Sequence, residues 1–254
     1  MITSYHRIGI GQETVRCFHK LGCRITAHYN TGPKGIHDVA GVLALQADVT
    51  KEGAVKKLFA QAQAEQDGIP VQVLIVNHGI WPAEPVMMAD MTLAQWRHTH
   101  AVNLDGAFLL CREYMHHLRS CSDASVLSCA SICFIGSTAG KFGEADHGDY
   151  ASTKASLMYG LVPTLKNELV RIAPAGRVNS VNPGWVKTPM AEKTIADEQV
   201  RARALASTPL QKVAMPTDVA RQVAVFTSPA LSSHVTGVNV QVDGGMEGRC
   251  LYPP

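Results

Sequence analysis

The chain has 254 residues, 46% of them hydrophobic and 17% charged, with a formal net charge of +2 at pH 7. This fits one globular domain, and the charge gives no reason to expect binding to nucleic acid or to an anionic membrane. The seven cysteines are odd in number and never form a C-x-x-C pair, which argues against a disulfide framework or a metal site. Since no apolar run suggests a signal peptide or a transmembrane helix, we expect a cytoplasmic protein.

Short apolar runs alternate with helix-length segments along the chain. In chain order we expect a helix over 12–21, strands over 24–28 and 42–47, a helix over 51–66 capped by Thr50, a strand over 71–76, helices over 92–103 and 106–119, a strand over 131–135, a helix over 149–170, a strand over 177–181, a helix over 216–227 and a strand over 238–242. This alternation predicts a single α/β domain over residues 1–254, built on a doubly wound parallel sheet. Ligands of such sheets bind beyond the carboxyl ends of the strands.

Tyr150 and Lys154 are four positions apart in a predicted helix, so they lie on one face of it. An ammonium group beside a phenol favours phenolate, and we therefore expect Lys154 to lower the pKa of Tyr150 from about 10. Such a tyrosine can exchange a proton with a ketone or an alcohol, and the Ser137 hydroxyl can hydrogen-bond the same oxygen. The Tyr-x-x-x-Lys spacing alone also occurs on ordinary exposed helix turns.

These residues are part of an ordered series of short motifs. The series is Asp48-Val49 after a strand, Asn-His-Gly at 77–79, Asn103, then Ser137, Tyr150 and Lys154, then Asn182–Pro189, and finally VTGVNVQVDGG at 235–245. In this order the motifs resemble the short-chain dehydrogenase/reductase family, and within it the 3-oxoacyl-[acyl-carrier-protein] reductases. The resemblance covers most of the chain. It implies one Rossmann-like domain, a nicotinamide cofactor, a small carbonyl or alcohol substrate, and a homo-oligomer (a tetramer or a dimer).

The resemblance also implies roles for particular residues. Tyr150 would be the general acid/base, Lys154 would tune it and bind the nicotinamide ribose, Ser137 would orient the carbonyl, and Asn103 would hold a water in the proton relay. Besides Tyr150 and Lys154, cofactor contacts are expected for Gly9, Ile10, Gly11, Asn30, Thr31, Asp48, Val49, Asn77, Gly79, Pro183, Gly184, Val186 and Thr188. Trp81 and Trp185 are candidates for contact with an apolar or ring-shaped substrate, although packing of loops explains both equally well. Residues 190–209 are the candidate lid over the substrate.

The segment at 28–31 bears on the choice of cofactor. It contains no acidic residue, which would bind the adenosine 2′-hydroxyl and repel a 2′-phosphate. Asn30 and Thr31 can donate hydrogen bonds to a phosphate, and Arg7 and Lys34 can supply positive charge. We therefore expect NADP(H) to be favoured over NAD(H), although an ordinary surface turn also accounts for this segment.

Two parts of the chain depart from the family pattern. Gly9 and Gly11 match the last two glycines of the phosphate loop, but Tyr5 stands in place of the first, and only Met1 and Ile2 are left for the first strand. We expect this shortened central strand to leave its neighbours uncovered. The 34 positions from Asn103 to Ser137 are also more than the family has, with residues 128–133 as the extra segment. Retained intron sequence and a real insertion both explain it.

The sequence thus predicts an NADPH-dependent oxidoreductase that reduces a ketone to a secondary alcohol, or the reverse, by hydride transfer with Tyr150 as the proton donor. Two alternatives stay open. One is a catalytically idle, truncated member that serves as a binding or assembly subunit, which the shortened amino end favours. The other is non-redox chemistry on the same fold, such as dehydration or epimerisation.

Overall fold

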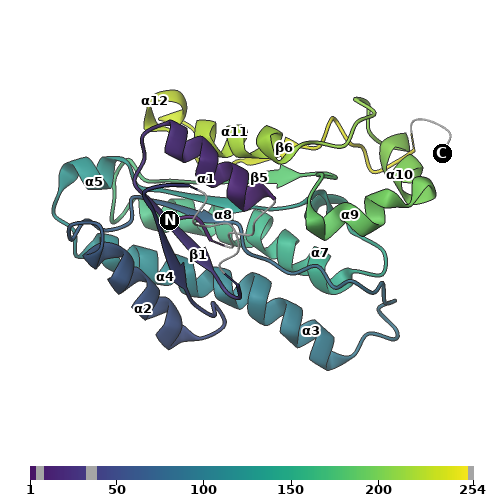
Figure 1. The fold of residues 1–254 in the computed structure, drawn as a ribbon, viewed down its shortest axis with the longest axis horizontal. Helices are drawn as coiled ribbons and strands as arrows, with labels where there is room; N and C mark the ends of the chain where they lie inside the picture. The colour runs from purple at the N-terminus through teal and green to yellow at the C-terminus, as the bar shows by residue number, and fades with distance from the viewer. Residues whose placement is uncertain (4–8, 33–38, 251–254) are drawn as a thin grey trace.

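The computed structural model of the chain describes residues 1–3, 9–32 and 39–250 (Figure 1). Its elements are α1 (Ile10–Lys20), β1 (Ile25–Tyr29), β2 (Val42–Gln46), α2 (Glu52–Ala64), β3 (Val73–Val76), α3 (Leu93–His100), the π-helix η2 (Ala101–Asp105), α4 (Gly106–Arg119), α5 (Ala124–Ser128), β4 (Ser131–Ile135), α6 (Thr138–Phe142), α7 (Gly148–Ala155), the π-helix η3 (Ser156–Leu161), α8 (Val162–Leu169), β5 (Arg177–Pro183), α9 (Pro189–Ala196), α10 (Glu198–Ala206), α11 (Pro216–Thr227), α12 (Pro229–Ser232) and β6 (Asn239–Val242). Tyr5, Arg7 and Lys34, which the sequence singled out, lie outside the described residues.

The strands form a parallel sheet in which the amino end of the chain joins two halves. On one side β1 pairs with β2, and on the other β3, β4, β5 and β6 pair in that order. Between them, the Ile2 amide donates to the Thr26 carbonyl at 2.9 Å, and the Thr3 amide donates to the Ile75 carbonyl at 3.0 Å. The expected Rossmann-like α/β fold is therefore confirmed.

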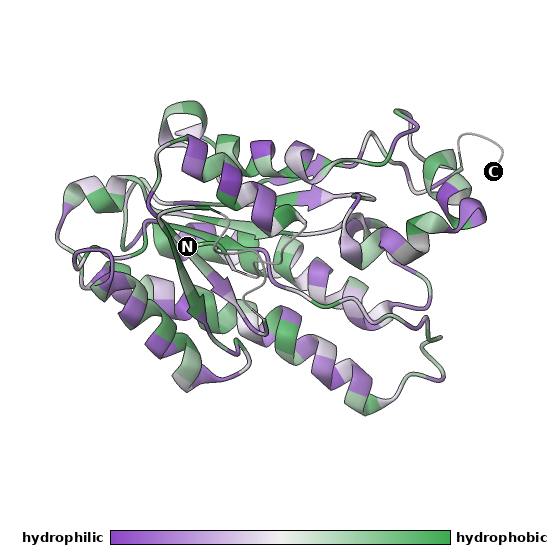
Figure 2. Ribbon diagram, in the orientation of Figure 1, coloured by the Kyte–Doolittle hydropathy of each residue, from purple (hydrophilic) through white to green (hydrophobic). Residues whose placement is uncertain are grey.

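Helices cover both faces of this sheet, and alternate side chains of the strands pack against them. On β3, Leu74 packs into a cluster with residues of α2, α4 and α8, whereas Ile75 packs into a second cluster with residues of α1 and α11. Figure 1 shows α1 and α11 together on one side of the sheet and α2 and α4 on the other. In Figure 2 the central strands are mostly hydrophobic, while the helices alternate hydrophilic and hydrophobic residues. Strands buried on both faces account for the nearly continuous apolar runs of the sequence.

The first strand is short, because Ile2 alone forms its bridges to Ala27 and Ile75. The expectation that this would uncover the neighbouring strands is wrong for the described residues, since Ala27 is 0% exposed and Ile75 is 1% exposed. Both stay covered because residues 1–3 hydrogen-bond to each neighbour and because Val15 and Phe18 of α1 pack in the same cluster.

Residues 128–133, the segment in excess of the family pattern, run from the last residue of α5 into the first three residues of β4. Residues 124–128 form the short helix α5, and the Asp123 side chain caps it by accepting from the Ser125 amide. β4 then leads directly into Gly136 and Ser137. Residues 131–133 are therefore an integral part of the sheet, paired with β3 and β5, and only residues 124–130 lie before the strand.

Two local expectations are corrected. The N-cap of α2 is Lys51 rather than Thr50, whose hydroxyl instead donates to the Asp48 carboxylate at 2.7 Å. The long helix expected over 149–170 begins at Gly148 and contains the π-helix η3. Within the described part of the chain, no helix combines the length and the apolar character needed to cross a membrane.

Candidate active site

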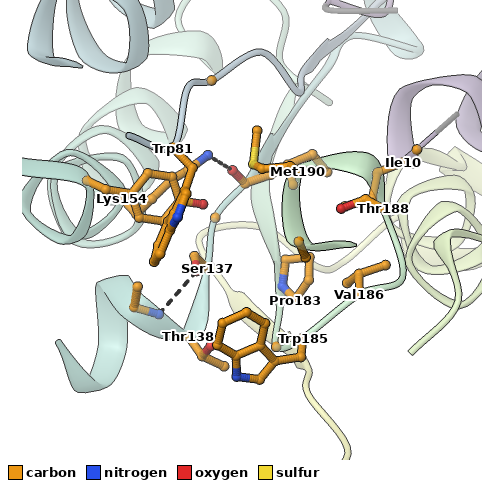
Figure 3. Close-up of a pocket in the computed structure, with 18 of the residues that line it drawn as sticks. Ile10, Trp81, Ser137, Thr138, Lys154, Pro183, Trp185, Val186, Thr188 and Met190 are labelled. Atoms are coloured by element: carbon orange, nitrogen blue, oxygen red, sulfur yellow. Dashed lines mark hydrogen bonds between the residues drawn. The ribbon is translucent and has the colours of Figure 1, made fainter. Parts of the chain in front are cut away.

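A cavity of about 880 Å³ lies where the strands end (Figure 3). Its walls come from the segments that directly follow β1, β3, β4 and β5, and from the beginning of α1. Most of the predicted site residues line it, namely Gly9, Ile10, Gly11, Thr31, Asn77, Gly79, Trp81, Ser137, Tyr150, Lys154, Pro183, Gly184, Trp185, Val186 and Thr188. Asn30, Asp48, Val49 and Asn103 do not line it. This is the edge of the sheet at which parallel α/β proteins bind their ligands.

The beginning of α1 offers an anion site at one end of the cavity. Gly9 caps the helix with φ 141°, a conformation that favours glycine, and a Cβ built there would meet no heavy atom within 4 Å. The first-turn amides of a helix lack partners within the helix and, with the helix dipole, attract negative charge. The open backbone and the long cavity beyond it fit a dinucleotide whose phosphates lie at α1.

Asn103 is fully buried beneath the cavity and is held by its own hydrogen bonds. Its Oδ1 accepts from the Ile80 amide at 2.8 Å, while its Nδ2 donates to the Ile80 carbonyl at 3.0 Å and to Thr153 Oγ1 at 3.2 Å. It lies on the π-helix η2, a local distortion that often occurs at functional sites. A Cβ on Gly79 would lie 3.4 Å from Asn103 Oδ1 and 3.5 Å from Lys154 Nζ, so both groups border the space beside Gly79.

Lys154 is buried below the cavity with its ammonium facing the backbone. Its Nζ donates to the Ile135 carbonyl at 2.7 Å and lies 5.6 Å from the centre of the Tyr150 ring (Figure 3). Burial lowers the pKa of Lys154 from 10.5 to about 8, because the charged form loses its hydration.

The expected lowering of the Tyr150 pKa is not found. Burial raises the pKa of Tyr150 to about 12, while the nearby Ser137 side chain acts in the opposite direction and the charge of Glu144 adds to the rise. A nearby ammonium favours phenolate, but the loss of hydration around the buried phenol disfavours it and is the larger effect here. Ser137 itself is fixed as the N-cap of α6, with its Oγ accepting from the Ala139 amide at 3.1 Å (Figure 3).

Trp81 lies against Tyr150 and against His147. Its ring meets Tyr150 edge-on with centroids 4.7 Å apart, and it lies against His147, tilted by 33°, with centroids 3.8 Å apart. His147 is buried, its Nδ1 has no hydrogen-bond partner among the described residues, and burial lowers its pKa. The three rings together fix the position of the phenol in the cavity wall.

Sequence reasoning also missed Glu144, which lines the cavity. Glu144 and His147 both belong to the segment between Ser137 and Tyr150, whose ends are predicted site residues. A segment whose two ends are site residues must pass beside the site. The location of Glu144 and His147 between Ser137 and Tyr150 was therefore the sequence feature that could have identified them. From the predicted lid, Met190 and Ala191 of α9 line the cavity.

Comparisons with known proteins add relatives of the whole chain. Residues 6–247 match the family described as Enoyl-(Acyl carrier protein) reductase. The cis-4-hydroxycyclohexanecarboxylate dehydrogenase of Sinomonas cyclohexanicum is 31% identical over 93% of this chain and 92% of its own. The (3R)-3-hydroxyacyl-CoA dehydrogenase of Rattus norvegicus is 35% identical over 92% of this chain and 82% of its own. Among solved structures, a short-chain dehydrogenase/reductase from Brucella melitensis, titled SDR:Glucose/ribitol dehydrogenase, matches with a TM-score of 0.81 and 28% identity, over 96% of this chain and 94% of its own.

Proposed function

This chain belongs to the short-chain dehydrogenase/reductase family, and from that premise we propose that it interconverts a small apolar ketone and its secondary alcohol, with NADP(H) favoured over NAD(H). Its relatives make it an oxidoreductase that acts on hydroxyl or keto groups of small molecules. One observation carries the proposal: Ser137, Tyr150 and Lys154 meet in a cavity that also reaches the open beginning of α1.

Tyr150 is the proton donor in the proposed reduction. With a pKa raised to about 12, its phenol stays protonated at neutral pH and can give its proton to a carbonyl oxygen. Ser137, which lies close enough to this phenol to lower its pKa, orients the same oxygen. The nicotinamide, when bound, supplies the hydride for reduction or accepts it for oxidation. Lys154 holds its positive charge over the Tyr150 ring. Asn103 fixes the backbone of Ile80 by accepting a hydrogen bond from its amide.

The proposed cofactor contacts follow the floor of the cavity. Gly9, Ile10 and Gly11 receive the phosphates at α1, and Thr31, which lines the cavity just after β1, faces the adenosine end. The preference for NADP(H) is supported by the absence of an acid at 28–31. Asp48 is the acid that follows β2. Its carboxylate accepts hydrogen bonds from the amide and the hydroxyl of Thr50, so it is already engaged within its own loop. The remaining contacts proposed are those of Asn30, Val49, Asn77, Gly79, Pro183, Gly184, Val186 and Thr188.

An apolar, ring-shaped ketone suits the opposite end of the cavity. Trp81, Phe142, Trp185 and Met190 line it, and residues 190–209 are the proposed lid. The relative from Sinomonas cyclohexanicum is named for a hydroxylated ring that also bears a carboxylate, so its name supports a ring-shaped substrate here but not a neutral one.

We further propose a homo-oligomer, a tetramer or a dimer, and a cytoplasmic location. The exposed ring of Phe108 on α4 supports contact with a second copy. The seven cysteines of the sequence support a reducing compartment, since those described are all unpaired.

Cofactor titration and one variant test the proposal. We expect nicotinamide fluorescence to show tighter binding of NADPH than of NADH. Tyr150→Phe should keep cofactor binding but lower ketone turnover by about 100-fold or more, the contribution typical of a positioned acid. The matched control is Tyr159→Phe, which removes an exposed hydroxyl outside the cavity.

The other outcomes distinguish the alternatives. Lack of binding of either nucleotide would favour an idle assembly subunit. Binding without turnover of any ketone would favour non-redox chemistry. Full activity of Tyr150→Phe would refute the assigned proton donor.

A further inference from the structure

The cavity carries very little charge. Among the described residues that line it, Glu144 and Lys154 are the only ones with a carboxylate or a cationic side chain. The Lys154 side chain is buried, and its ammonium donates to the Ile135 carbonyl, so it faces the floor rather than the open space. Glu144 is therefore the charged group most directly presented to a ligand at the catalytic end.

Glu144 lies in the segment that connects α6 to α7, between Ser137 and Tyr150. Its charge is close enough to raise the pKa of the Tyr150 phenol, on which the proposed reaction depends. No ion pair joins Glu144 to a basic residue in the described ranges. Burial also raises the pKa of Glu144, as expected for a carboxyl group partly withdrawn from water.

We propose that Glu144 is a specificity-determining residue that disfavours ketones bearing a negative charge and so selects neutral ones. The inference rests on the proposed function and deepens it. A substrate carboxylate brought into this space would meet a like charge at reduced dielectric screening. The walls formed by Trp81, Phe142 and Trp185 offer no cation to neutralise it, whereas a neutral ring packs against them without this penalty.

Two ketones that share a ring but differ in charge test this selection. The ratio of kcat/KM for cyclohexanone to that for 4-oxocyclohexanecarboxylate, measured by NADPH oxidation, should exceed one in the unmodified protein. Glu144→Gln should lower this ratio about tenfold, equivalent to about 1.4 kcal/mol, as expected for removal of one like charge. Glu144→Lys should lower it further and favour the anionic ketone. Any effect on Tyr150 cancels in the ratio, because both ketones use the same proton donor.

Asp146→Asn is the matched control. Asp146 is an exposed acid two positions further on that does not line the cavity, and asparagine tolerates its positive φ of 64°. This variant should leave the ratio unchanged. An equal change in Asp146→Asn would mean that the ratio reports the general surface potential, and would overturn the inference.

A second measurement needs no variant. Cyclohexanecarboxamide, a neutral analogue, should inhibit the unmodified protein at lower concentration than cyclohexanecarboxylate. Equal inhibition, or an unchanged ketone ratio in both Glu144 variants, would overturn the role of Glu144 while leaving the proposed function intact. Failure to turn over either ketone despite NADPH binding would overturn the proposed function and this inference together.

Discussion

Lys154 should make the fold less stable at neutral pH than the same fold without its charge. A pKa lowered from 10.5 to about 8 corresponds to about 3 kcal/mol of unfavourable free energy when the buried amine is protonated. Lys154→Met removes this cost but leaves the Ile135 carbonyl without the ammonium that now donates to it, a loss of about 1–3 kcal/mol. At pH near 7 the variant should therefore be as stable as the unmodified protein, or up to about 2 kcal/mol more stable.

The pH dependence isolates the contribution of the charge. Between the lowered pKa of about 8 and the ordinary value of 10.5, the unfolded chain binds more protons than the folded one. Stability contributed by this group therefore rises with pH across that window. From pH about 7 to about 9.5, the unmodified protein should gain about 2 kcal/mol relative to Lys154→Met. The contributions of other titrating groups are common to both proteins and cancel.

Urea unfolding followed by tryptophan fluorescence at both pH values measures this difference. Lys57→Met is the matched control, because Lys57 is exposed on α2 and its ammonium is hydrated in both states. Its free energy of unfolding relative to the unmodified protein should not change with pH. A difference for Lys154→Met that stays constant within about 0.5 kcal/mol would refute the claim that the ammonium is held at a desolvation cost.

Two further predictions concern the cofactor and the packing beneath the site. Thr31→Asp places a carboxylate near the proposed adenosine phosphate, so the preference for NADPH over NADH in fluorescence titrations should fall at least about tenfold, and an equal loss for both nucleotides would contradict a phosphate site there. Gly136→Ala would overlap Asn182 Oδ1 and place its Cβ 2.9 Å from Met158 Cγ, so it should destabilise the fold by about 1–3 kcal/mol in urea unfolding. Gly53→Ala on α2, where a Cβ meets nothing within 4 Å, should be neutral or slightly stabilising, and similar losses for both variants would argue against a packing cause.

The elements set by local pattern could be predicted well. α4, α11 and β4 have the bounds expected from the sequence. α11 begins at Pro216, a residue suited to the first helical position, and β4 is buried along its whole length. The order of strands and helices then brought most of the predicted residues to one edge of the sheet, because parallel strands share the direction of their carboxyl ends.

The features that depend on distant contacts could not be predicted. Asn103 is held by Ile80, 23 positions away, and nothing in the local sequence indicates the π-helix that carries it. Thr50 has the side chain of a helix cap, but the neighbouring Asp48 carboxylate takes its hydroxyl. The direction of the Tyr150 pKa depends on how completely the assembled fold removes water from the phenol, and a spacing of four residues contains no information about that.

Burial and charge together bias the proposed site toward reduction of a ketone. Reduction needs a neutral Tyr150, and its pKa of about 12 keeps it neutral at physiological pH. Oxidation of an alcohol by the proposed mechanism needs the phenolate, which the raised pKa makes scarce at neutral pH. Glu144 strengthens this bias because its negative charge opposes the phenolate, and Lys154 relieves little of it because its ammonium donates to the Ile135 carbonyl. Efficient oxidation would therefore require a ligand that changes the electrostatic environment of the phenol, whereas reduction can use the protonated state that the fold already stabilises.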